Sequence, residues 1–435
     1  MALGTEGYSA ALVAKIEYAG AHQESFQKAA ENLAYVGDLS ISGKHVQRIT
    51  ARLGRERARQ RDQDVQQMQA RELQPAYRQP PQVVAVHVDA GKLRLRAEDG
   101  QPGVREPHWA DTKVACLQTY TSVPCEHDPQ PEPPALFLDP PRVVRLCQEM
   151  EQIRGNPATR PKAAKPATPL LAETIRERPE RLVRTAVATM QGTEGFGWMV
   201  AAEALRRGFY QAVRRAVVGD GGNWIGPLGD LHFPGWVQVL DFLHLLVHLY
   251  AGATAAYRDL GSRGTFRAWR LYEQLLQAAW AGQVVQVQGL LREHLERLGP
   301  VPARAQADHP SKVVSLVLDY VTDNAARMDY PRYRREGLPV TSTIVESLIK
   351  QFNQRVKGTE KFWLRGGAEA ILQGRAAYLS EDGRGRDFYA HRPRGPAVGR
   401  NRLQLSAGTV MHPYADPTQL ASGLRALISD PSSLH

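Results

Sequence analysis

Near the N-terminus, apolar residues recur at the three- and four-residue spacing of a helix. Over 22–35 this pattern predicts an amphipathic helix, which Gly37 and Asp38 end. Ser42 can cap a second helix, whose basic residues are Lys44, Arg48, Arg52, Arg55, Arg57, Arg59 and Arg61. Helix, turn and basic helix predict a helix-turn-helix-like DNA-binding domain over 1–62, with a helical hairpin and a solvated basic face as the alternative.

Two-residue alternation then replaces the helical pattern and indicates strands. Residues 63–81, rich in Gln and Arg in their first part, are predicted to be a linker or a helical extension. The β-branched run 83–88 predicts a buried strand closed by Asp89, and further strands follow at 92–96 and 113–123. The first two are expected to be separate strands joined by a turn.

The remaining pattern predicts an irregular segment followed by strands and many helices. Frequent prolines over 124–169 predict a surface excursion with little regular structure. The later elements are, in chain order, a helix at 197–213, strands at 216–218 and 237–240, an all-helical stretch at 253–335, a helix at 342–357, and a basic flexible tail at 383–435. Together these elements predict an α/β fold.

Composition favours polyanionic partners and argues against disulfide-rich, structural-zinc and membrane proteins. Lys and Arg number 55 against 45 Asp and Glu, a formal net charge of +10, which favours a partner such as nucleic acid. The 3 cysteines form no C-x-x-C pair, so neither a disulfide framework nor a structural zinc site is expected. The most apolar stretch, 242–257, is too short to span a bilayer and contains two histidines. We therefore expect a cytoplasmic protein without a membrane anchor.

Three carboxylates suggest metal-dependent chemistry. Asp89 and Asp220 stand at predicted strand ends, where side chains converge on one edge of an open sheet, and Glu346 lies on a late helix. Oxygen ligands suit Mg²⁺ or Mn²⁺, and a pair of such ions supports phosphodiester cleavage. Each residue also has a simpler interpretation. Asp89 and Asp220, near glycines, could simply be turn residues, and Thr343 with Glu346 has the spacing of a capping box.

The sequence around these carboxylates has a recognisable order. The first motif, with Asp89, is VVAVHVDAGKLRLR; the second, with Asp220, is VVGDGGNWI, followed by VLDFLHLLVHLY; the third, with Glu346, is GLPVTSTIVESLIKQFNQRVKGTEKFW. Over about 82–380 the chain resembles DDE transposases of bacterial insertion sequences, in the Mutator-related group and nearest to its ISKra-type members. Two features depart from that pattern: the long proline-rich stretch, and the Val-Thr-Ser-Thr lead into Glu346 in place of a glycine-rich one.

The resemblance implies an RNase H-like catalytic core interrupted by a helical insertion. In this chain the first part of the core would span 82–252, the all-helical insertion 253–335, and the second part of the core 336–382. The core would consist of three antiparallel strands, a helix, a strand, another helix or strand and, after the insertion, the helix of the glutamate. Strands and helices expected from the pattern alone follow the same order.

The resemblance also implies an activity and its partners. Asp89, Asp220 and Glu346 would be the catalytic residues and would hold Mg²⁺ (or Mn²⁺), while Asp241 and His244 match a D-x-x-H signature and would support the site or position DNA. The implied function is strand cleavage at the ends of an insertion sequence and strand transfer to target DNA. The partners would be double-stranded DNA, as terminal inverted repeats and as target, and a second copy of the chain, in the cytoplasm at the bacterial nucleoid.

Several further residues are candidates for DNA contact. Candidates for phosphate or base contact are Lys44, Arg48, Arg52, Lys350, Asn353, Lys357 and Trp363. Lys350, Asn353 and Lys357 share the helix face of the glutamate, although a solvated polar face is the alternative. The Trp363 ring could stack on an unpaired base or belong to the core. His248 shares a helix face with Asp241 and His244, which makes a zinc site conceivable, but the apolar surroundings favour a structural role.

Two other functions use the same features. A transposase-derived regulator without activity would use only the basic N-terminal domain to bind DNA. A metal-dependent nuclease would use Asp89, Asp220 and Glu346 to cut DNA without joining the ends to a target. Metal-dependent nicking separates the first alternative from an enzyme, and detection of joined products separates the second from a transposase.

Overall fold

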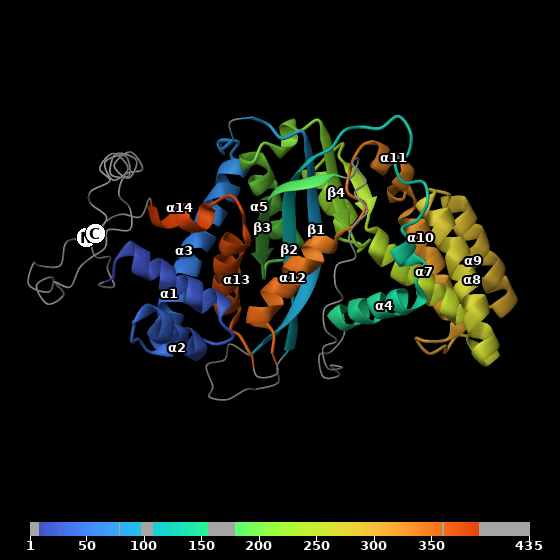
Figure 1. The fold of residues 1–435 in the computed structure, drawn as a ribbon, viewed down its shortest axis with the longest axis horizontal. Helices are drawn as coiled ribbons and strands as arrows, with labels where there is room; N and C mark the ends of the chain where they lie inside the picture. The colour runs from blue at the N-terminus through green and yellow to red at the C-terminus, as the bar shows by residue number, and fades with distance from the viewer. Residues whose placement is uncertain (1–7, 78, 97–107, 155–178, 359–360, 391–435) are drawn as a thin grey trace, which may run out of the picture. The chain divides into compact units, whose positions relative to one another are not determined.

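A five-stranded mixed sheet lies at the centre of the fold (Figure 1). The computed structural model describes residues 8–77, 79–96, 108–154, 179–358 and 361–390. Of these, Val13–Ala390 form one compact unit, and the description below concerns that unit. The strands are β1 (Val83–Leu95), β2 (His108–Thr121), β3 (Glu180–Thr189), β4 (Arg214–Gly219) and β5 (Val237–Leu240).

The sheet has the strand order β3-β2-β1-β4-β5. β1 pairs antiparallel with β2, and β2 pairs antiparallel with β3. β4 and β5 run parallel to β1 on its other side. The expected α/β class is therefore confirmed at the level of a mixed sheet covered by helices.

Helices cover both faces of the sheet and extend the fold beyond β5 and β3 (Figure 1). The N-terminal and middle helices are α1 (Ala10–His22), α2 (Phe26–Gly37), α3 (Gly43–Gln69), α4 (Pro140–Arg154), α5 (Thr193–Arg206), α6 (Ile225–His232) and α7 (Phe242–Ala256). The later ones are α8 (Gly261–Trp280), α9 (Val284–Leu298), α10 (Pro310–Asp323), α11 (Tyr330–Arg335), α12 (Thr343–Val356), α13 (Arg365–Leu379) and α14 (Arg384–Ala390). Short 3-10 turns are η1 (Ala135–Phe137), η2 (Phe209–Gln211), η3 (Arg258–Leu260) and η4 (Ala325–Arg327).

The two faces of β1 contact different cores, because successive side chains of a strand point to opposite sides. Its even-numbered valines pack with α5 and α6. On the opposite face, Val83 and Ala85 join a cluster with α7, α8 and α10, whereas Leu93 and Leu95 join a separate cluster with α12 and α13. Asp89 is also an odd-numbered residue of β1, so its side chain is on the same face as these four residues and lies between the two clusters.

Two strand predictions need correction. The segments 83–88 and 92–96 are one continuous strand, β1, because β2 pairs with it through Asp89, Ala90 and Gly91 without a turn. The third antiparallel strand is β3, which the sequence pattern did not predict. Its first half is largely exposed and carries three charged residues, so it lacks the apolar alternation of a strand.

The proline-rich stretch 124–169 is more ordered than expected in its first part. It contains η1 and α4, and Phe137, Val143, Cys147 and Met150 are buried in the cluster that includes α7. The prolines do not prevent α4, because Pro140 begins the helix, where a missing N–H is tolerated. The expectation of an irregular excursion is wrong for 135–154, and residues 155–169 lie outside the described residues.

At the N-terminus, the predicted helix-turn-helix segment forms the helices α2 and α3. The Ser25 and Ser42 side chains cap them by accepting from the backbone N–H groups of Lys28 and His45. Asp38 adopts a left-handed conformation at φ 49° and ends α2. α3 continues to Gln69, past the boundary predicted at 62, so residues 63–69 form the helical extension that was the alternative to a linker.

The helix α3 packs closely against α13, and this contact requires a glycine. A Cβ atom at Gly54 would lie 2.1 Å from the carbonyl oxygen of Ala370. We expect Gly54→Ala to lower the free energy of unfolding by about 1–3 kcal/mol, because two backbones must separate. Gly289→Ala on α9 meets no atom within 4 Å and is the control, with an expected gain of about 0.5–1 kcal/mol. Denaturant titration measures both, and equal effects would contradict the close contact.

The prediction of an all-helical stretch is confirmed, whereas the start of the predicted flexible tail is a helix. Every described element between 253 and 335 is helical, as the pattern predicts. The predicted flexible tail begins instead with α14, whose Arg384 pairs with the buried Glu203 of α5. The tail arginines from Arg392 onward lie outside the described residues. Within the described part of the chain, we find no helix with the length and apolarity to cross a bilayer.

Candidate active site

Three aspartates follow the last paired positions of three parallel strands. The last paired row across β1, β4 and β5 is Val88, Gly219 and Leu240. Asp89, Asp220 and Asp241 are the next residues, so they begin the following row. There β4 and β5 end, while β1 continues along β2. The parallel register therefore brings three carboxylates together at one edge, although Asp89 does not close its strand as expected.

A cavity of about 200 Å³ opens at this edge of the sheet. Its lining residues are Asp89, Ala90, Gly91, Lys92, Met150, Asp220, His244 and Glu346. The structure thus brings the three predicted carboxylates into one cavity, from β1, the end of β4 and α12. It adds residues that the sequence analysis did not single out, notably Lys92 and Met150. Met150 could not be found from the sequence, because the prolines around it predicted an irregular segment.

Asp89 is held in a strongly unfavourable environment for a carboxylate. The residue is only 8% exposed, and its Oδ1 accepts a hydrogen bond from the backbone N–H of Ala90 at 2.6 Å. Burial, with a contribution from the negative charge of Asp220, raises the pKa of Asp89 to about 7. The cavity therefore favours either a proton or a cation beside this carboxylate.

Asp220 sits in a glycine turn directly after β4. Its Oδ1 accepts from the backbone N–H of Gly222 at 3.0 Å, and Gly221 has a φ of +80°, which favours glycine. The backbone carbonyl of Asp220 accepts a hydrogen bond from the hydroxyl of Tyr320 on α10 at 2.7 Å. The carboxylate is thus placed by the turn, and the turn is attached to the helical insertion.

Glu346 lies in the first turn of α12, which crosses the face of β1 and β2 (Figure 1). The N-cap position of the helix is Ser342, whose side chain makes no capping hydrogen bond; Thr343 is the first helical residue, so the capping-box interpretation is wrong. Glu346 is buried, and within the described residues its Oε1 accepts no hydrogen bond. Burial, followed by the charge of Asp241, raises the pKa of Glu346. A buried carboxylate oxygen without a donor is a feature that a bound cation satisfies.

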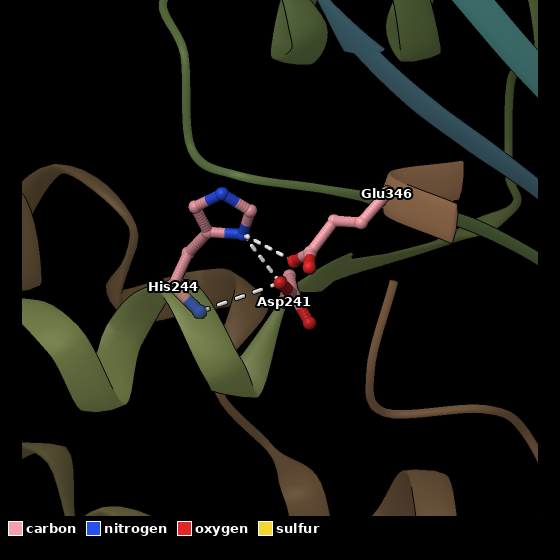
Figure 2. Close-up of side chains that lie close together, drawn as sticks. All are labelled: Asp241, His244 and Glu346. Carbon is pink, nitrogen blue, oxygen red and sulfur yellow. Dashed lines mark hydrogen bonds and ion pairs between the residues drawn. The ribbon is translucent and has the colours of Figure 1, made fainter. Parts of the chain in front are cut away.

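Asp241 and His244 form a charged pair beside Glu346 (Figure 2). Asp241 is the N-cap of α7, where its side chain accepts from the backbone N–H groups of Leu243 and His244. It also accepts from the backbone N–H of Ser342 at 2.7 Å, just before α12. Asp241 therefore connects the beginning of α7 to the beginning of the helix that carries Glu346.

The Asp241 carboxylate keeps His244 protonated. Burial alone lowers the pKa of His244, but the short hydrogen bond from its Nδ1 to Asp241 outweighs burial and raises the pKa to about 9. The same Nδ1 lies 3.9 Å from Oε1 of Glu346, and Figure 2 shows both carboxylates on this side of the ring. The pair thus places an imidazolium at the wall of an acidic cavity.

One group of side chains is close enough to share a metal ion among the described residues. One potential ligand atom from each of Asp241, His244 and Glu346 lies within 4.8 Å of the others. The sequence analysis gave Asp241 and His244 a supporting role; the structure places them as direct neighbours of Glu346. Asp89 and Asp220 face the same cavity. The carboxylates suit a divalent cation, whereas His244, protonated beside Asp241, adds positive charge and would be a ligand only as a neutral imidazole.

The predicted DNA contacts on α12 differ in their exposure. Lys350 is exposed, and its Nζ lies 3.7 Å from Glu149 of α4. Asn353 and Lys357 are half-buried, and burial lowers the pKa of Lys357. Of the three, Lys350 is therefore the cation most accessible to a phosphate, once it leaves Glu149.

The Trp363 side chain is held by a hydrogen bond and by packing contacts. Its Nε1 donates to the carbonyl of Val356 at 2.9 Å, and its ring meets Phe26 edge to face. It packs against the cluster of α12 and α13. These contacts favour the core interpretation of Trp363 over stacking on a base.

The basic residues of α3 form a partly exposed row. Lys44 and Arg48 are exposed, and Arg48 contacts the ring of His45 at 2.8 Å. Arg52 is half-buried and lies 3.7 Å from Glu56. None of the three lines the acidic cavity. Within the described residues, His248 stacks on Tyr320 with ring centroids 3.9 Å apart, in line with the structural role expected for it.

Comparison with protein-family models gives no match to this chain, and a search of curated proteins gives none either.

Proposed function

We propose that the protein is a DNA transposase that cuts strands at the ends of an insertion sequence and joins them to target DNA, using Mg²⁺ or Mn²⁺. The observation that carries this proposal is the convergence of Asp89, Asp220 and Glu346 on one cavity, although they are far apart in the chain. Three acidic groups around one or two divalent cations are the requirement of phosphodiester chemistry without a covalent intermediate.

The strand order supports the same proposal. An RNase H-like core, which the motif resemblance implies, has three antiparallel strands followed by parallel ones. The sheet agrees with this pattern, because β3, β2 and β1 are antiparallel neighbours and β4 and β5 run parallel to β1. The helices α8–α11 lie between β5 and α12 in the chain, where the insertion is expected. A fold of this kind is compatible with many activities, so the cavity carries the functional part of the proposal.

The residues of the cavity fit a divalent cation. Asp89 has a pKa of about 7 without one, and Oε1 of Glu346 lacks a hydrogen-bond donor among the described residues. Asp89, Asp220 and Glu346 would hold the cation. When bound, Mg²⁺ or Mn²⁺ supplies the positive charge that activates an attacking hydroxyl and stabilises the leaving oxygen of a phosphodiester.

Other residues of the chain would orient the DNA. Lys92 lines the cavity and is exposed, and Lys350 lies one helical turn after Glu346, so both can bind phosphates beside the scissile bond. The imidazolium of His244, held by Asp241, adds positive charge at the cavity wall. The exposed basic residues of α3 would bind the terminal inverted repeats. A dimer or larger assembly of the chain would then hold two ends together.

A strand-transfer assay tests the function. The substrate is linear DNA that carries the sequences flanking the gene, and the target is a supercoiled plasmid, with Mg²⁺, Mn²⁺ or EDTA. Metal-dependent cleavage and joined products support the proposal. Cleavage without joined products would indicate a nuclease, and DNA binding without cleavage in either metal would indicate a regulator; either outcome overturns the proposal.

Cation binding should also stabilise the protein. We expect Mn²⁺ at about 100 times its dissociation constant to raise the free energy of unfolding by about 2.7 kcal/mol. The gain should be largely lost in Glu346→Gln, since this change removes one charged ligand. Thermal unfolding with Mn²⁺ and with EDTA measures the difference. An equal gain in the wild-type protein and the variant would place the cation elsewhere.

A further inference from the structure

Three tyrosines of the helical insertion donate to backbone carbonyls near the ends of β4 and β5. Tyr320 donates to Asp220 at 2.7 Å, Tyr330 to Leu240 at 3.0 Å and Tyr333 to Gln238 at 3.2 Å. The first two carbonyls are at the edge where the acidic cavity opens, and the third lies earlier in β5. The insertion is therefore attached to the sheet at the site itself.

The Asp220 carbonyl is the one of these three that belongs to a residue of the cavity. Asp220 follows the last β1–β4 and β4–β5 pairs, so its backbone is beyond the ladder. The hydroxyl of Tyr320 supplies the donor that a neighbouring strand would otherwise supply. The position of the Asp220 carboxylate thus depends on a side chain from α10.

The Tyr320 ring is itself fixed in place. It stacks on His248 of α7, with an angle of 25° between the rings, and α7 and α10 pack against each other. On its other side, a Cβ atom at Gly221 would lie 2.9 Å from the Tyr320 ring. The ring therefore fits closely against the turn that carries Asp220, and a rigid support is what a ligand carboxylate requires.

We infer that Tyr320 is a positioning residue for the cation site: it fixes the Asp220 turn so that the carboxylate meets Asp89 and Glu346. This inference rests on the proposed function, since it assumes that the cavity holds a divalent cation. Loss of an outer partner of a metal ligand typically weakens metal binding about 10–100-fold. We expect Tyr320→Phe, which removes only the hydroxyl, to weaken Mn²⁺ binding about tenfold.

Tyr333→Phe provides the matched control. It removes the same group from the same insertion, but its partner is the carbonyl of Gln238, two residues before the end of β5. Each change should cost a similar amount of stability, about 0.5–1.5 kcal/mol for one hydrogen bond. Only Tyr320→Phe should change metal affinity, which separates positioning from general stability.

The experiment is a Mn²⁺ titration of the full-length protein, followed by electron paramagnetic resonance of the free ion. The proteins are wild type, Tyr320→Phe, Tyr333→Phe and Asp220→Asn, with thermal unfolding in EDTA as the stability measurement. A dissociation constant raised about tenfold in Tyr320→Phe and within about twofold of wild type in Tyr333→Phe supports the inference.

The outcomes separate this inference from the proposed function. If Asp220→Asn loses Mn²⁺ binding but Tyr320→Phe binds like wild type, the positioning role is wrong and the cation site stands. Equal weakening in Tyr320→Phe and Tyr333→Phe also rejects the positioning role. If wild type binds no Mn²⁺, or Asp220→Asn binds it unchanged, the cation site is wrong and the inference fails with it.

Discussion

Asp89→Asn is expected to reduce metal-dependent strand cleavage by at least about 10³-fold while leaving binding to the terminal repeats unchanged. The carboxylate lines the cavity with Asp220 and Glu346, and a neutral amide cannot replace its charge beside a cation. The basic row on α3 is elsewhere in the chain, so DNA affinity should not depend on this residue. Cleavage and gel-shift measurements on the same DNA test both parts.

The same variant should be more stable than wild type when no metal is present. Asp89 has its pKa raised from 3.8 to about 7, so its ionised form destabilises the folded state. This cost is absent below pH 4, grows as the pH rises toward 7, and is constant above it. At pH 8 in EDTA we expect Asp89→Asn to gain about 2–4 kcal/mol of unfolding free energy, and the gain should vanish near pH 4.

Stability thus distinguishes an inactive enzyme from a misfolded one. Asp323→Asn, an exposed carboxylate on α10, is the control and should change neither cleavage nor stability. Unchanged cleavage in Asp89→Asn would remove Asp89 from the mechanism. Lost cleavage with a lower stability in EDTA at pH 8 would show that the environment of this carboxylate differs from the one described.

Asp241→Ala should have the largest effect on stability. The side chain is fully buried and accepts from Ser342 and from the backbone N–H groups at the start of α7, and it pairs with His244. Its removal leaves a buried imidazolium without its partner. Breaking a buried charged pair costs about 3–5 kcal/mol, and we expect a loss of this size in urea unfolding at pH 6.

The pH dependence of this loss follows from His244. Its pKa is raised from 6.5 to about 9 in the folded protein, so its stabilising charge is fully present below pH 6.5 and is lost as the pH rises through 9. The negative groups that raise the pKa are Asp241, Asp220 and Asp89. The difference between wild type and Asp241→Ala should therefore narrow between pH 6 and pH 10.

A conservative variant separates charge from capping. Asp241→Asn keeps an oxygen that can cap α7 but removes the negative charge. At pH 6 it should therefore lower the free energy of unfolding by less than Asp241→Ala does. If Asp241→Ala lost less than about 1 kcal/mol at pH 6, the pair would contribute no more than a single ordinary hydrogen bond. That result would contradict the role of Asp241 as the connection between α7 and α12.

Periodicity and local signals were sufficient for much of the architecture. The helix of Glu346, the short strands β4 and β5 and the helices after 253 have strong local patterns, and the structure contains them. β1 was divided wrongly, because Asp89, Ala90 and Gly91 have the composition of a turn. Its continuity comes from pairing with β2, which no local window contains. α4 is not evident from the sequence for a different reason: Pro140 and Pro141 stand at its start and other prolines precede and follow it, so the segment has the composition of an irregular stretch.

The site was predictable in part. Strand ends indicated that Asp89 and Asp220 would converge, and the motif order indicated Glu346 and its neighbours Asp241 and His244. Local sequence could not indicate that Met150 covers the cavity or that Tyr320 holds the Asp220 turn, because both depend on the packing of distant helices. It also could not decide the role of Trp363, which its contacts with Val356 and Phe26 make clearer.

The separation of the two hydrophobic clusters on one face of β1 has a consequence for the width of the acidic cavity. Glu346 is on α12, which packs in one cluster, whereas His244 is on α7, which packs in the other. Backbone donors cross the gap: Ser342 to the Asp241 carboxylate, and Phe242 to the carbonyl of Val340. These two hydrogen bonds therefore help to fix the distance between Glu346 on α12 and the Asp241–His244 pair at the start of α7, and losing either one should loosen the site while leaving both hydrophobic clusters intact.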